Sequence, residues 1–504
     1  MLIIDGASLS LDDIVTVAYG NEPVAISNEA RVQIDRARAV VDAKAAGDDA
    51  VYGVNTGFGS FAEVRIDADA LDALQINLLR SHAAGVGPPL PAATVRAMML
   101  LRANVLARGH SGIRGATIDA LIALLNAQVH PVVPSRGSVG ASGDLAPLAH
   151  LSLILIGEGE AIVSGEVRPG AHALASAGLR PVRLGPKEGL ALINGTQASA
   201  AVLALALHRA QRLVRAADVV AALSVDALRG SSRPFEARIH EARPHPGQAV
   251  SAANIARLLA ASAINASHAN CGRVQDAYSQ RCAAQVHGAV RDALAYARRI
   301  VETEANASTD NPMVFADTGE IVSGGNFHGA PIGIAADLVA LVLTQLATIS
   351  ERRSERLVNP ALSGLPPFLT SRGGIESGLM LAQVTAAALA SEMKSLAHPA
   401  SVDTIPTSGN KEDHVSMSMT AALKAEQAVV LATDVLAIEL LCAARAIDLL
   451  APLATSAALS RVHRAVRAVV PAHDGDAPPS PDIAALARII AAGELDHASG
   501  LDVN

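Results

Sequence analysis

Long segments in which apolar residues recur at helical spacing occupy most of the second part of this sequence and limit the folds that it can adopt. From about residue 200 onward, this spacing continues through six segments: 198–228, 249–266, 283–305, 333–357, 376–397 and 415–448. Polar loops that contain Gly or Pro separate them. Helices of this length bury their apolar stripes against one another. The pattern therefore predicts a mainly α fold built on a long antiparallel helical bundle.

The first part of the chain follows a different pattern. Residues 1–200 mix shorter helical stretches with Gly-rich loops at 53–59, 85–89 and 135–143. A chain of 504 residues is longer than a single core usually spans. We therefore expect a loop-rich N-terminal lobe at 1–200, followed by the long bundle and the C-terminal helices at 201–504.

Composition limits how these helices pack. Half of the residues are hydrophobic, yet only 2% are aromatic and there is no Trp. Small side chains therefore do most of the packing, and an aromatic residue placed in a polar motif carries extra information. A long bundle with so few aromatic residues is expected to bury more surface by forming an oligomer.

Charge and cysteine content indicate a cytoplasmic protein. The net charge of −8 is spread along the chain without basic clusters, which argues against a nucleic-acid or anionic membrane partner. The N-terminus lacks the basic region of a signal peptide, and the apolar run 335–349 is broken by Asp337 and Gln345 before it reaches membrane length. The three cysteines form no close pair and no metal-type spacing: Cys271, Cys282 and Cys442.

A glycine-rich segment at 137–148 precedes one of the shorter helices. It contains Ala141-Ser142-Gly143, followed by Asp144, which is a good helix cap. The three residues would thus lie at a helix N-terminus, where the helix dipole stabilises negative charge. An ordinary Gly/Ser turn is the alternative from pattern alone. The spacing fits neither a nucleophile elbow, because Asp144 fills its last position, nor a nucleotide-binding loop.

This segment resembles the signature of the aromatic amino acid ammonia-lyases, and the resemblance extends from about residue 3 to 490. In that family, Ala-Ser-Gly cyclises and loses two waters to give the electrophile 4-methylidene-imidazol-5-one (MIO). The resemblance implies that Ala141, Ser142 and Gly143 are its precursors and that no metal or diffusible cofactor is needed. It also implies a bundle architecture shared with the fumarase–aspartase group, and a homotetramer with active sites shared between subunits.

Two residues of the N-terminal lobe are assigned roles by the same resemblance. Tyr52 lies among glycines and would be the base that removes the β-proton of the substrate, which requires a nearby positive field because an unperturbed Tyr has a pKa near 10. Gly57 and Gly59 would suit a lid hinge. His82 ends a predicted helix and would face the substrate ring, where a His favours a polar ring. From pattern alone, an exposed phenol in a turn and a His at a helix C-terminus remain open.

Other residues complete the set that the resemblance assigns. If 275–285 is helical, Gln275, Tyr278 and Arg281 lie along one face, and a solvated polar face is the alternative. Arg281 has the planar fork that suits a carboxylate and would hold that of the substrate, with Tyr278 and Gln275 ordering substrate and electrophile. Asn194 would bond the amino acid and the cofactor region. Phe327 would pack at the electrophile.

Glu412 matters most for the choice of substrate. Residues 410–417 are predicted to open a helix, with Asn410 as its cap, so that Glu412 could be merely a first-turn acid. By resemblance, Glu412 binds an imidazole, whereas the matching residue is generally Gln in lyases acting on tyrosine or phenylalanine. Beside a phenyl ring, a carboxylate would be a buried charge without a partner. Lys411 could pair with Glu412 and alter affinity.

The resemblance, with these residues in their assigned roles, implies a carbon–nitrogen lyase that converts L-histidine to trans-urocanate and ammonia. Three alternatives remain open. The chain could act on tyrosine or phenylalanine, or move ammonia to the β-carbon as a 2,3-aminomutase. It could be a catalytically silent helical assembly in which Ala141-Ser142-Gly143 never cyclises. A fumarase-like lyase lacks support, because the Gly-Ser-Ser-x-Met-Pro-x-Lys-x-Asn loop of that group is absent from residues 407–414.

Overall fold

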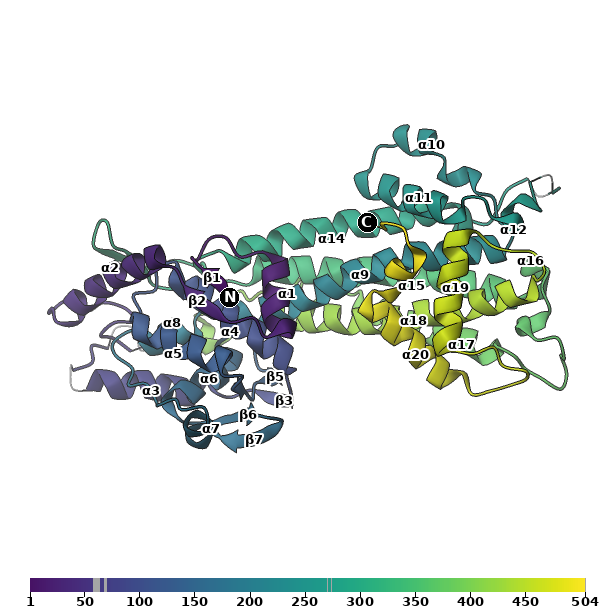
Figure 1. Cartoon of the computed structure of the whole chain (residues 1–504). Coiled ribbons are helices and arrows are strands. Elements are labelled where there is room, and N and C mark those ends of the chain that lie inside the picture. The colour runs from purple at the N-terminus through teal and green to yellow at the C-terminus, as the bar shows by residue number, and fades with distance from the viewer. Residues whose placement is uncertain (58–63, 68–69, 270, 273, 504) are drawn as a thin grey trace. The chain divides into compact units, whose positions relative to one another are not determined.

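The computed structural model describes residues 1–57, 64–67, 70–269, 271–272 and 274–503. Helices dominate it, which confirms the predicted fold class (Figure 1). The six long predicted segments correspond to α9 (Gln197–Ala227), α11 with α12 (Pro246–Leu259 and Ala263–Ala266), α14 (Ala283–Ala305), α15 (Ala330–Val358), α17 (Met380–Leu396) and α18 (Ser418–Leu449). Periodicity located these helices well because their apolar stripes are long.

The described chain forms two compact units, each made of segments that are discontinuous in sequence. Unit 1 comprises Met1–Leu205, Arg298–Asp337 and Pro399–Lys424, and unit 2 comprises Ala206–Ala297, Leu338–His398 and Ala425–Asn504. Four helices, α9, α14, α15 and α18, have residues in both units. The division at residue 200 into two contiguous lobes stays a prediction, since it follows sequence pattern rather than contacts.

Buried polar pairs join the long helices within unit 2. Asp218 of α9 accepts hydrogen bonds from His287 (2.8 Å) and Arg291 (2.6 Å) of α14. Glu439 of α18 pairs with Arg353 of α15 at 2.5 Å, and both side chains are fully buried. Burial would raise the pKa of Asp218, but Arg291 and His287 outweigh it and hold the pKa at about 2. These charges fix which helix faces meet.

The remaining elements of unit 2 are short helices and the C-terminal helices. They are η4 (Arg233–Phe235), α10 (Ala237–Glu241), α13 (Tyr278–Arg281), α16 (Pro360–Ser363), η5 (Pro367–Leu369), α19 (Ala457–Val469), α20 (Pro479–Ala492) and α21 (Glu494–Ser499). The amphipathic helix expected after the Pro-rich stretch 474–482 is α20, which begins inside that stretch.

Unit 1 packs short helices with very short strands. Its helices are α1 (Leu11–Gly20), α2 (Asn28–Ala45), α3 (Leu71–His82), α4 (Ala92–Ala107), α5 (Gly115–Asn126), α6 (Leu145–Leu153), η3 (Ile154–Ile156), α7 (Gly170–Ser176), α8 (Glu188–Ile193) and η6 (Ser408–Asn410). Its strands are β1 (Leu2–Ile4), β2 (Val24–Ile26), β3 (Val86–Pro89), β4 (His130–Pro131), β5 (Pro134–Arg136), β6 (Glu160–Val163), β7 (Glu166–Pro169), β8 (Met313–Phe315) and β9 (Glu320–Val322). Strands this short show no alternating pattern, so the sequence did not predict them.

One of the small sheets positions the glycine-rich segment. β1 pairs with β2 in parallel, whereas β3–β5, β4–β6–β7 and β8–β9 are antiparallel. β3 follows α3 and β5 directly precedes Gly137. The Gly85 backbone lies so close that a Cβ on Gly137 would be 3.1 Å from the Gly85 Cα. Pairing of β3 with β5 therefore brings the end of α3, at His82, toward the segment that contains Ala141-Ser142-Gly143.

Two helices, α15 and α18, are long and apolar enough to span a membrane by length and composition alone. Their most apolar windows have mean hydropathies of 2.0 and 1.8. The expectation that the run around 335–349 stops short of membrane length is therefore wrong for α15. However, 67% and 78% of these windows are buried inside the chain, which is the burial of core helices.

Candidate active site

The glycine-rich segment ends at the N-terminus of α6, as predicted. α6 begins at Leu145, directly after Asp144. Gly137, Gly140 and Gly143 all have positive φ angles, of 134°, 66° and 76°. Backbone of this kind favours glycine, because a Cβ would be strained there. The segment is thus a tightly folded turn with Ala141 and Gly143 buried and Ser142 half-buried.

Asp144 holds this turn in place, but not as a helix cap. It occupies the position before α6, yet its side chain makes no capping hydrogen bond. Instead, its carboxylate accepts bonds from the Ser138 hydroxyl (2.7 Å) and from the backbone N–H and hydroxyl of Ser199 at the start of α9, both at 2.8 Å. Burial raises the pKa of Asp144, and these bonds partly offset that effect. The capping expectation is therefore wrong: Asp144 joins the turn to α9.

Gly143 packs directly on the backbone of Gly195. The Asp144 N–H donates to the Gly195 carbonyl oxygen at 2.7 Å. A Cβ built on Gly143 would lie 2.2 Å from that oxygen, so only glycine fits. Among the described residues, the Gly143 N–H has no hydrogen-bond acceptor. Within the described chain, the Gly143 nitrogen therefore donates no hydrogen bond that would have to break before it could react.

Asn194 contacts the centre of the same turn. Its side-chain amide donates to the Ser142 carbonyl oxygen at 2.8 Å. The Asn194 side-chain oxygen is buried and has no partner among the described residues. Asn194 ends α8, and its own carbonyl accepts from the buried guanidinium of Arg102 at 2.9 Å. Burial lowers the pKa of Arg102 to about 10, with Asp310 opposing the shift.

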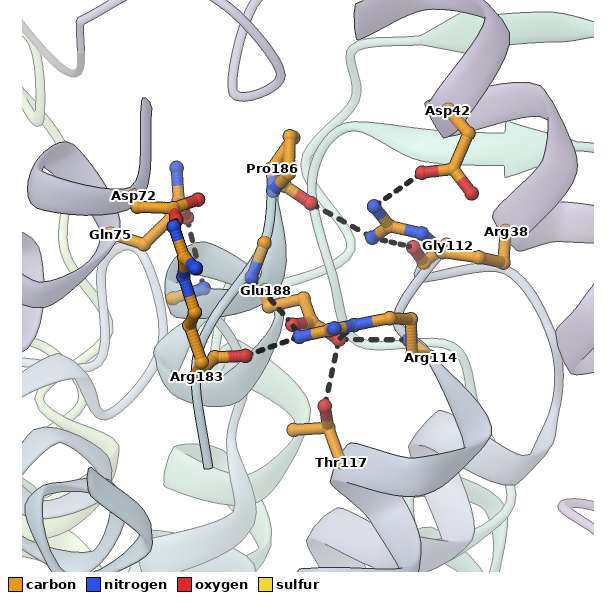
Figure 2. A network of polar contacts seen from close by, with 12 residues as sticks. Arg38, Asp42, Asp72, Gln75, Gly112, Arg114, Thr117, Arg183, Pro186 and Glu188 are labelled. Carbon is orange, nitrogen blue, oxygen red and sulfur yellow. Dashed lines mark hydrogen bonds and ion pairs between the residues drawn. The ribbon is translucent and has the colours of Figure 1, made fainter. Parts of the chain in front are cut away.

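A polar network anchors the other end of α8 (Figure 2). Glu188 is fully buried and accepts from the Arg114 backbone and side chain, from Thr117 at 2.8 Å and from the Gly185 N–H at 2.7 Å. Gln75 of α3 accepts from the Gly189 N–H at 2.9 Å. The network therefore fixes α8 to α5 and α3, which in turn fixes Asn194 over the turn.

Glu412 contacts the hydroxyl of Ser142. The Ser142 Oγ–H donates to Glu412 Oε1 at 2.5 Å, and the hydroxyls of Thr407 (2.5 Å) and Ser408 (2.9 Å) donate to Oε2. These residues belong to a turn that an isolated bridge between Thr407 and Glu412 closes. Glu412 therefore faces the turn that contains Ala141-Ser142-Gly143.

The helix expected to open at Asn410 begins later. α18 starts at Ser418, residues 408–410 form the short helix η6, and Asn410 has a φ of 69°. The prediction failed because an acid-rich stretch before an apolar run imitates a helix N-terminus. Glu412 is consequently no first-turn acid. Lys411 is exposed and forms no ion pair with Glu412 within the described chain, so the expected pairing is also wrong.

The surroundings of Glu412 and His82 set their protonation states. Burial pushes the pKa of Glu412 up, but hydrogen bonds from Ser142, Thr407 and Ser408 outweigh it and lower the pKa. His82 ends α3, as predicted, and its Nδ1–H donates to the Leu78 carbonyl at 2.8 Å. Burial lowers the pKa of His82, against the Leu78 bond and the charge of Glu412. The site therefore has an ionised carboxylate near a neutral imidazole.

Two further segments clamp the turn. The Met417 N–H donates to the Val139 carbonyl at 2.8 Å, and the Ser416 hydroxyl donates to the Gly140 carbonyl at the same distance. The Gly329 N–H also donates to that Gly140 carbonyl, at 3.1 Å. Phe327 precedes Gly329 by two residues in a turn and is half-buried. This places its segment beside the glycine-rich turn, while the role of its ring stays a prediction.

Tyr52 is half-buried in a turn at residues 52–55. A Cβ on its neighbour Gly53, whose φ is 74°, would lie 2.8 Å from the Leu190 side chain of α8 and 3.1 Å from Pro312. The Tyr52 turn therefore packs on the helix that carries Asn194. Gly59 lies outside the described residues, so the lid hinge at Gly57 and Gly59 stays a prediction.

The residues proposed for the substrate carboxylate belong to unit 2. They do not lie on one helical face, because Gln275 precedes the short helix α13 and Cys282 separates that helix from α14. They nevertheless gather: Arg281 donates to the Gln275 side-chain oxygen at 3.0 Å and lies 4.6 Å from the centre of the Tyr278 ring. Gln275 and Arg281 line a cavity of about 690 Å³ in unit 2.

Several buried polar residues near the turn escaped the sequence prediction. Lys187 and Asp310 form a fully buried ion pair at 3.2 Å, and Thr196 donates to Glu304 at 2.6 Å. Thr407 and Ser408, which hold Glu412, were also missed. Asp310 lies in the polar stretch Ser308-Thr309-Asp310-Asn311-Pro312 between two long helices. The others have no local pattern, because their partners are distant in sequence.

Comparisons with known proteins agree with this arrangement. The family model described as aromatic amino acid lyase matches residues 9–468. A histidine ammonia-lyase of Gloeobacter violaceus is 56% identical over 98% of this chain and 96% of the relative. Among solved structures, histidine ammonia-lyase from Trypanosoma cruzi is 43% identical, with a TM-score of 0.92 over 99% of this chain and 95% of the other. Tyrosine aminomutase from Streptomyces globisporus is 37% identical, with a TM-score of 0.94 over 99% and 98% of the two chains. The chain therefore belongs to the aromatic amino acid lyase family.

Proposed function

We propose that the protein is a histidine ammonia-lyase, which eliminates ammonia from L-histidine to give trans-urocanate. The observation that carries the proposal is the position of Glu412, whose ionised carboxylate contacts Ser142 and lies near the neutral ring of His82. The relatives named histidine ammonia-lyase support it, at 52–56% identity over nearly the whole chain.

The electrophile MIO would form from Ala141, Ser142 and Gly143, and the surrounding residues fit it. When present, this group supplies the electrophilic centre that activates the amino acid for loss of ammonia. Gly143 has no room for a side chain, and its nitrogen is free of other backbone contacts. The Asn194 amide donates to the Ser142 carbonyl, which would become the ring carbonyl, and so draws electron density from the conjugated system.

Substrate binding would use groups that the structure leaves available. The buried Asn194 side-chain oxygen lacks a partner among the described residues and suits the amino group of the substrate. Glu412 would accept the imidazole N–H, and the Nε2 of neutral His82, also without a hydrogen-bond partner in the described chain, would bond the other side of the ring. Tyr52 would remove the β-proton as the general base.

The substrate carboxylate would be held by Arg281, with Gln275 and Tyr278 ordering it. The stacking of Arg281 over Tyr278 and its bond to Gln275 preset the orientation of the guanidinium fork. We place these residues in the active site of a neighbouring subunit within a homotetramer. The cavity that Arg281 lines would then receive the glycine-rich turn of another copy. Tyr278 is 71% exposed in the single chain, which suits burial at such an interface.

A cytoplasmic location without metal, nucleic-acid or membrane partners completes the proposal. All three cysteines are free, and the described residues contain no cluster of His, Cys, Asp or Glu able to hold a metal. The partner would be a small-molecule amino acid, histidine, which suits a role in histidine catabolism.

The second candidate is a 2,3-aminomutase, favoured by the similarity to tyrosine aminomutase. Glu412 argues only against an aminomutase of phenylalanine, because a phenyl ring offers the carboxylate no hydrogen-bond donor. Chiral analysis of the products for β-amino acids separates the two outcomes.

The test combines intact mass with turnover. The matured chain is expected to be lighter by two water molecules, and to give ultraviolet absorbance of a conjugated product with histidine but not with tyrosine or phenylalanine. Ser142→Ala should keep its full mass and be inactive. His82→Leu should mature normally but lose histidine turnover. Turnover of tyrosine alone, or full activity of Ser142→Ala, would contradict the proposal.

A further inference from the structure

Glu412 contacts Ser142, the residue that loses its hydroxyl and its N–H hydrogen when the electrophile forms. The Ser142 hydroxyl donates to Glu412 Oε1 at 2.5 Å. The Ser142 backbone N–H faces the same carboxylate and contributes to lowering the pKa of Glu412. Formation of the electrophile removes the hydrogen from that nitrogen and the oxygen from that side chain. Substrate binding alone does not require this contact with the Ser142 hydroxyl.

We propose that Glu412 is the acid–base residue that matures the electrophile, before it serves the substrate. The proposal rests on the function proposed above. It assigns Glu412 two successive tasks: proton transfer within the newly folded chain, and then recognition of the imidazole.

The proton transfers balance without any outside reagent. The Gly143 nitrogen bonds to the Ala141 carbonyl carbon, and its proton moves to the Ala141 oxygen, which becomes a hydroxyl. Glu412 takes the Ser142 N–H proton, the freed electron pair forms the C=N bond, and the hydroxyl leaves with its bonding pair as hydroxide. That hydroxide takes the Ser142 Cα hydrogen and becomes the first water. The Cα–H pair forms the Cα=Cβ bond as the Cβ–Oγ bond breaks. The departing Oγ–H takes the proton from Glu412 and becomes the second water, and Glu412 is a carboxylate again.

The neighbouring acids are less suited to this task. Both oxygens of Asp144 already accept hydrogen bonds, from Ser138 and from Ser199. Glu304 is buried against Thr196 and makes no hydrogen bond to Ser142 within the described chain. Among the acids of the described residues, Glu412 alone contacts the Ser142 hydroxyl, and Thr407 and Ser408 hold its far oxygen.

The geometry also implies that Glu412 acts in maturation first and in substrate recognition second. In the unmatured chain, the Ser142 hydroxyl occupies Glu412 Oε1, which is the oxygen that an imidazole N–H would need. Departure of the hydroxyl as water leaves that oxygen without its donor. The imidazole subsite therefore becomes complete only in a chain that carries the electrophile.

The experiment follows maturation itself rather than activity. The full chain is synthesised in a cell-free system, samples are quenched at intervals, and intact mass gives the fraction that has lost two waters. Glu412→Gln keeps a hydrogen-bond acceptor but cannot carry a proton, so its maturation should be slower by about 100-fold or more. Glu304→Gln, the same change at a buried acid that does not contact Ser142, should mature at the wild-type rate.

The outcomes separate the inference about maturation from the proposed function. Wild-type maturation of Glu412→Gln would overturn the inference, even if histidine turnover by the wild-type chain upheld the proposed function. Slow maturation of Glu412→Gln, together with a matured wild-type chain that does not act on histidine, would uphold the inference and overturn the histidine assignment. If Glu412→Gln does not fold by circular dichroism, Thr407→Val decides, because it keeps the carboxylate and removes one hydroxyl that holds it. Slower maturation of Thr407→Val supports the inference, and an unchanged rate contradicts it.

Discussion

The backbone of Gly195 lies so close to Gly143 that a side chain on Gly143 has no room. The Gly195 carbonyl oxygen accepts the Asp144 N–H at 2.7 Å and would lie 2.2 Å from a Cβ on Gly143. A Cβ on Gly195 would in turn lie 2.5 Å from the Arg102 guanidinium. The contact presses the glycine-rich turn onto the backbone between α8 and α9. It therefore fixes the position of Gly143, whose nitrogen is proposed to close the ring.

This contact predicts that Gly143→Ala costs more than its backbone angle alone. Gly165 is the matched control, since its φ of 86° is also positive but a Cβ on it would have no atom within 4 Å. Gly165→Ala should lower the free energy of unfolding by about 1–2 kcal/mol, the usual cost of a left-handed Ala. Gly143→Ala should lower it further and block the loss of two waters. Equal thermal midpoints for the two variants, with normal mass loss in Gly143→Ala, would contradict the prediction.

Asn194→Asp should reduce turnover without preventing folding. The substitution replaces the amide that donates to the Ser142 carbonyl by an acid that cannot donate when ionised. Loss of one such donor usually lowers kcat by about 100- to 1,000-fold. The measurement is kcat per matured chain, with maturation read from intact mass. Asn126→Asp is the control, because Asn126 also donates to a backbone carbonyl, that of Val24, but away from Ser142. Equal kcat values in the two variants would refute the assigned role of Asn194.

The sequence predicted the long helices, and it predicted that the glycine-rich turn lies at the N-terminus of α6. Both features depend on local sequence pattern. The sequence also predicted where α3 ends, at His82. It placed the start of α18 directly after Asn410 instead of at Ser418, since Asn410, Glu412 and Asp413 resemble a helix start. In the structure this stretch is a turn, closed by the bridge between Thr407 and Glu412.

Contacts between residues distant in sequence could not be predicted. Glu412 meets Ser142 across 270 positions, and Asp144 meets Ser199 across 55. No local pattern distinguishes an Asp that caps the helix it precedes from an Asp whose carboxylate hydrogen-bonds to a different helix. The grouping of Gln275 with Arg281 was expected from a helical face, but α13 is too short for that, and the pair forms by direct contact instead.

The buried pair of Lys187 and Asp310 predicts a large loss of stability when one partner is removed. Both side chains are fully buried, and burial lowers the pKa of Lys187. Lys187→Met would remove the ion-pair partner of the buried Asp310 carboxylate and leave it with the charge of Arg102 alone, and breaking a buried pair typically costs about 3–5 kcal/mol. Its thermal midpoint should fall clearly, and Asp310→Asn in the same chain should restore part of the loss. Arg80→Met, at an exposed pair with Glu158, is the control and should leave the midpoint unchanged. A Lys187→Met midpoint equal to that control would contradict the prediction.

Cys442 should resist alkylation in the folded protein over the whole range in which an ordinary thiol reacts. Burial, reinforced by the charge of Glu439, raises the pKa of Cys442 to about 12. At pH 8 only about one thiol in 10⁴ would then be ionised, and since the thiolate is the reactive form, iodoacetamide should not label it. Raising the pH to 10 increases that fraction about 100-fold and still leaves it near 1%.

Unfolding returns the Cys442 thiol to water and to its ordinary pKa, so labelling should then follow quickly. Peptide mapping by mass spectrometry measures the labelling, with the exposed Cys271 as the internal control. Labelling of Cys442 at the rate of Cys271 in the folded chain would show that α18 does not bury the thiol as described.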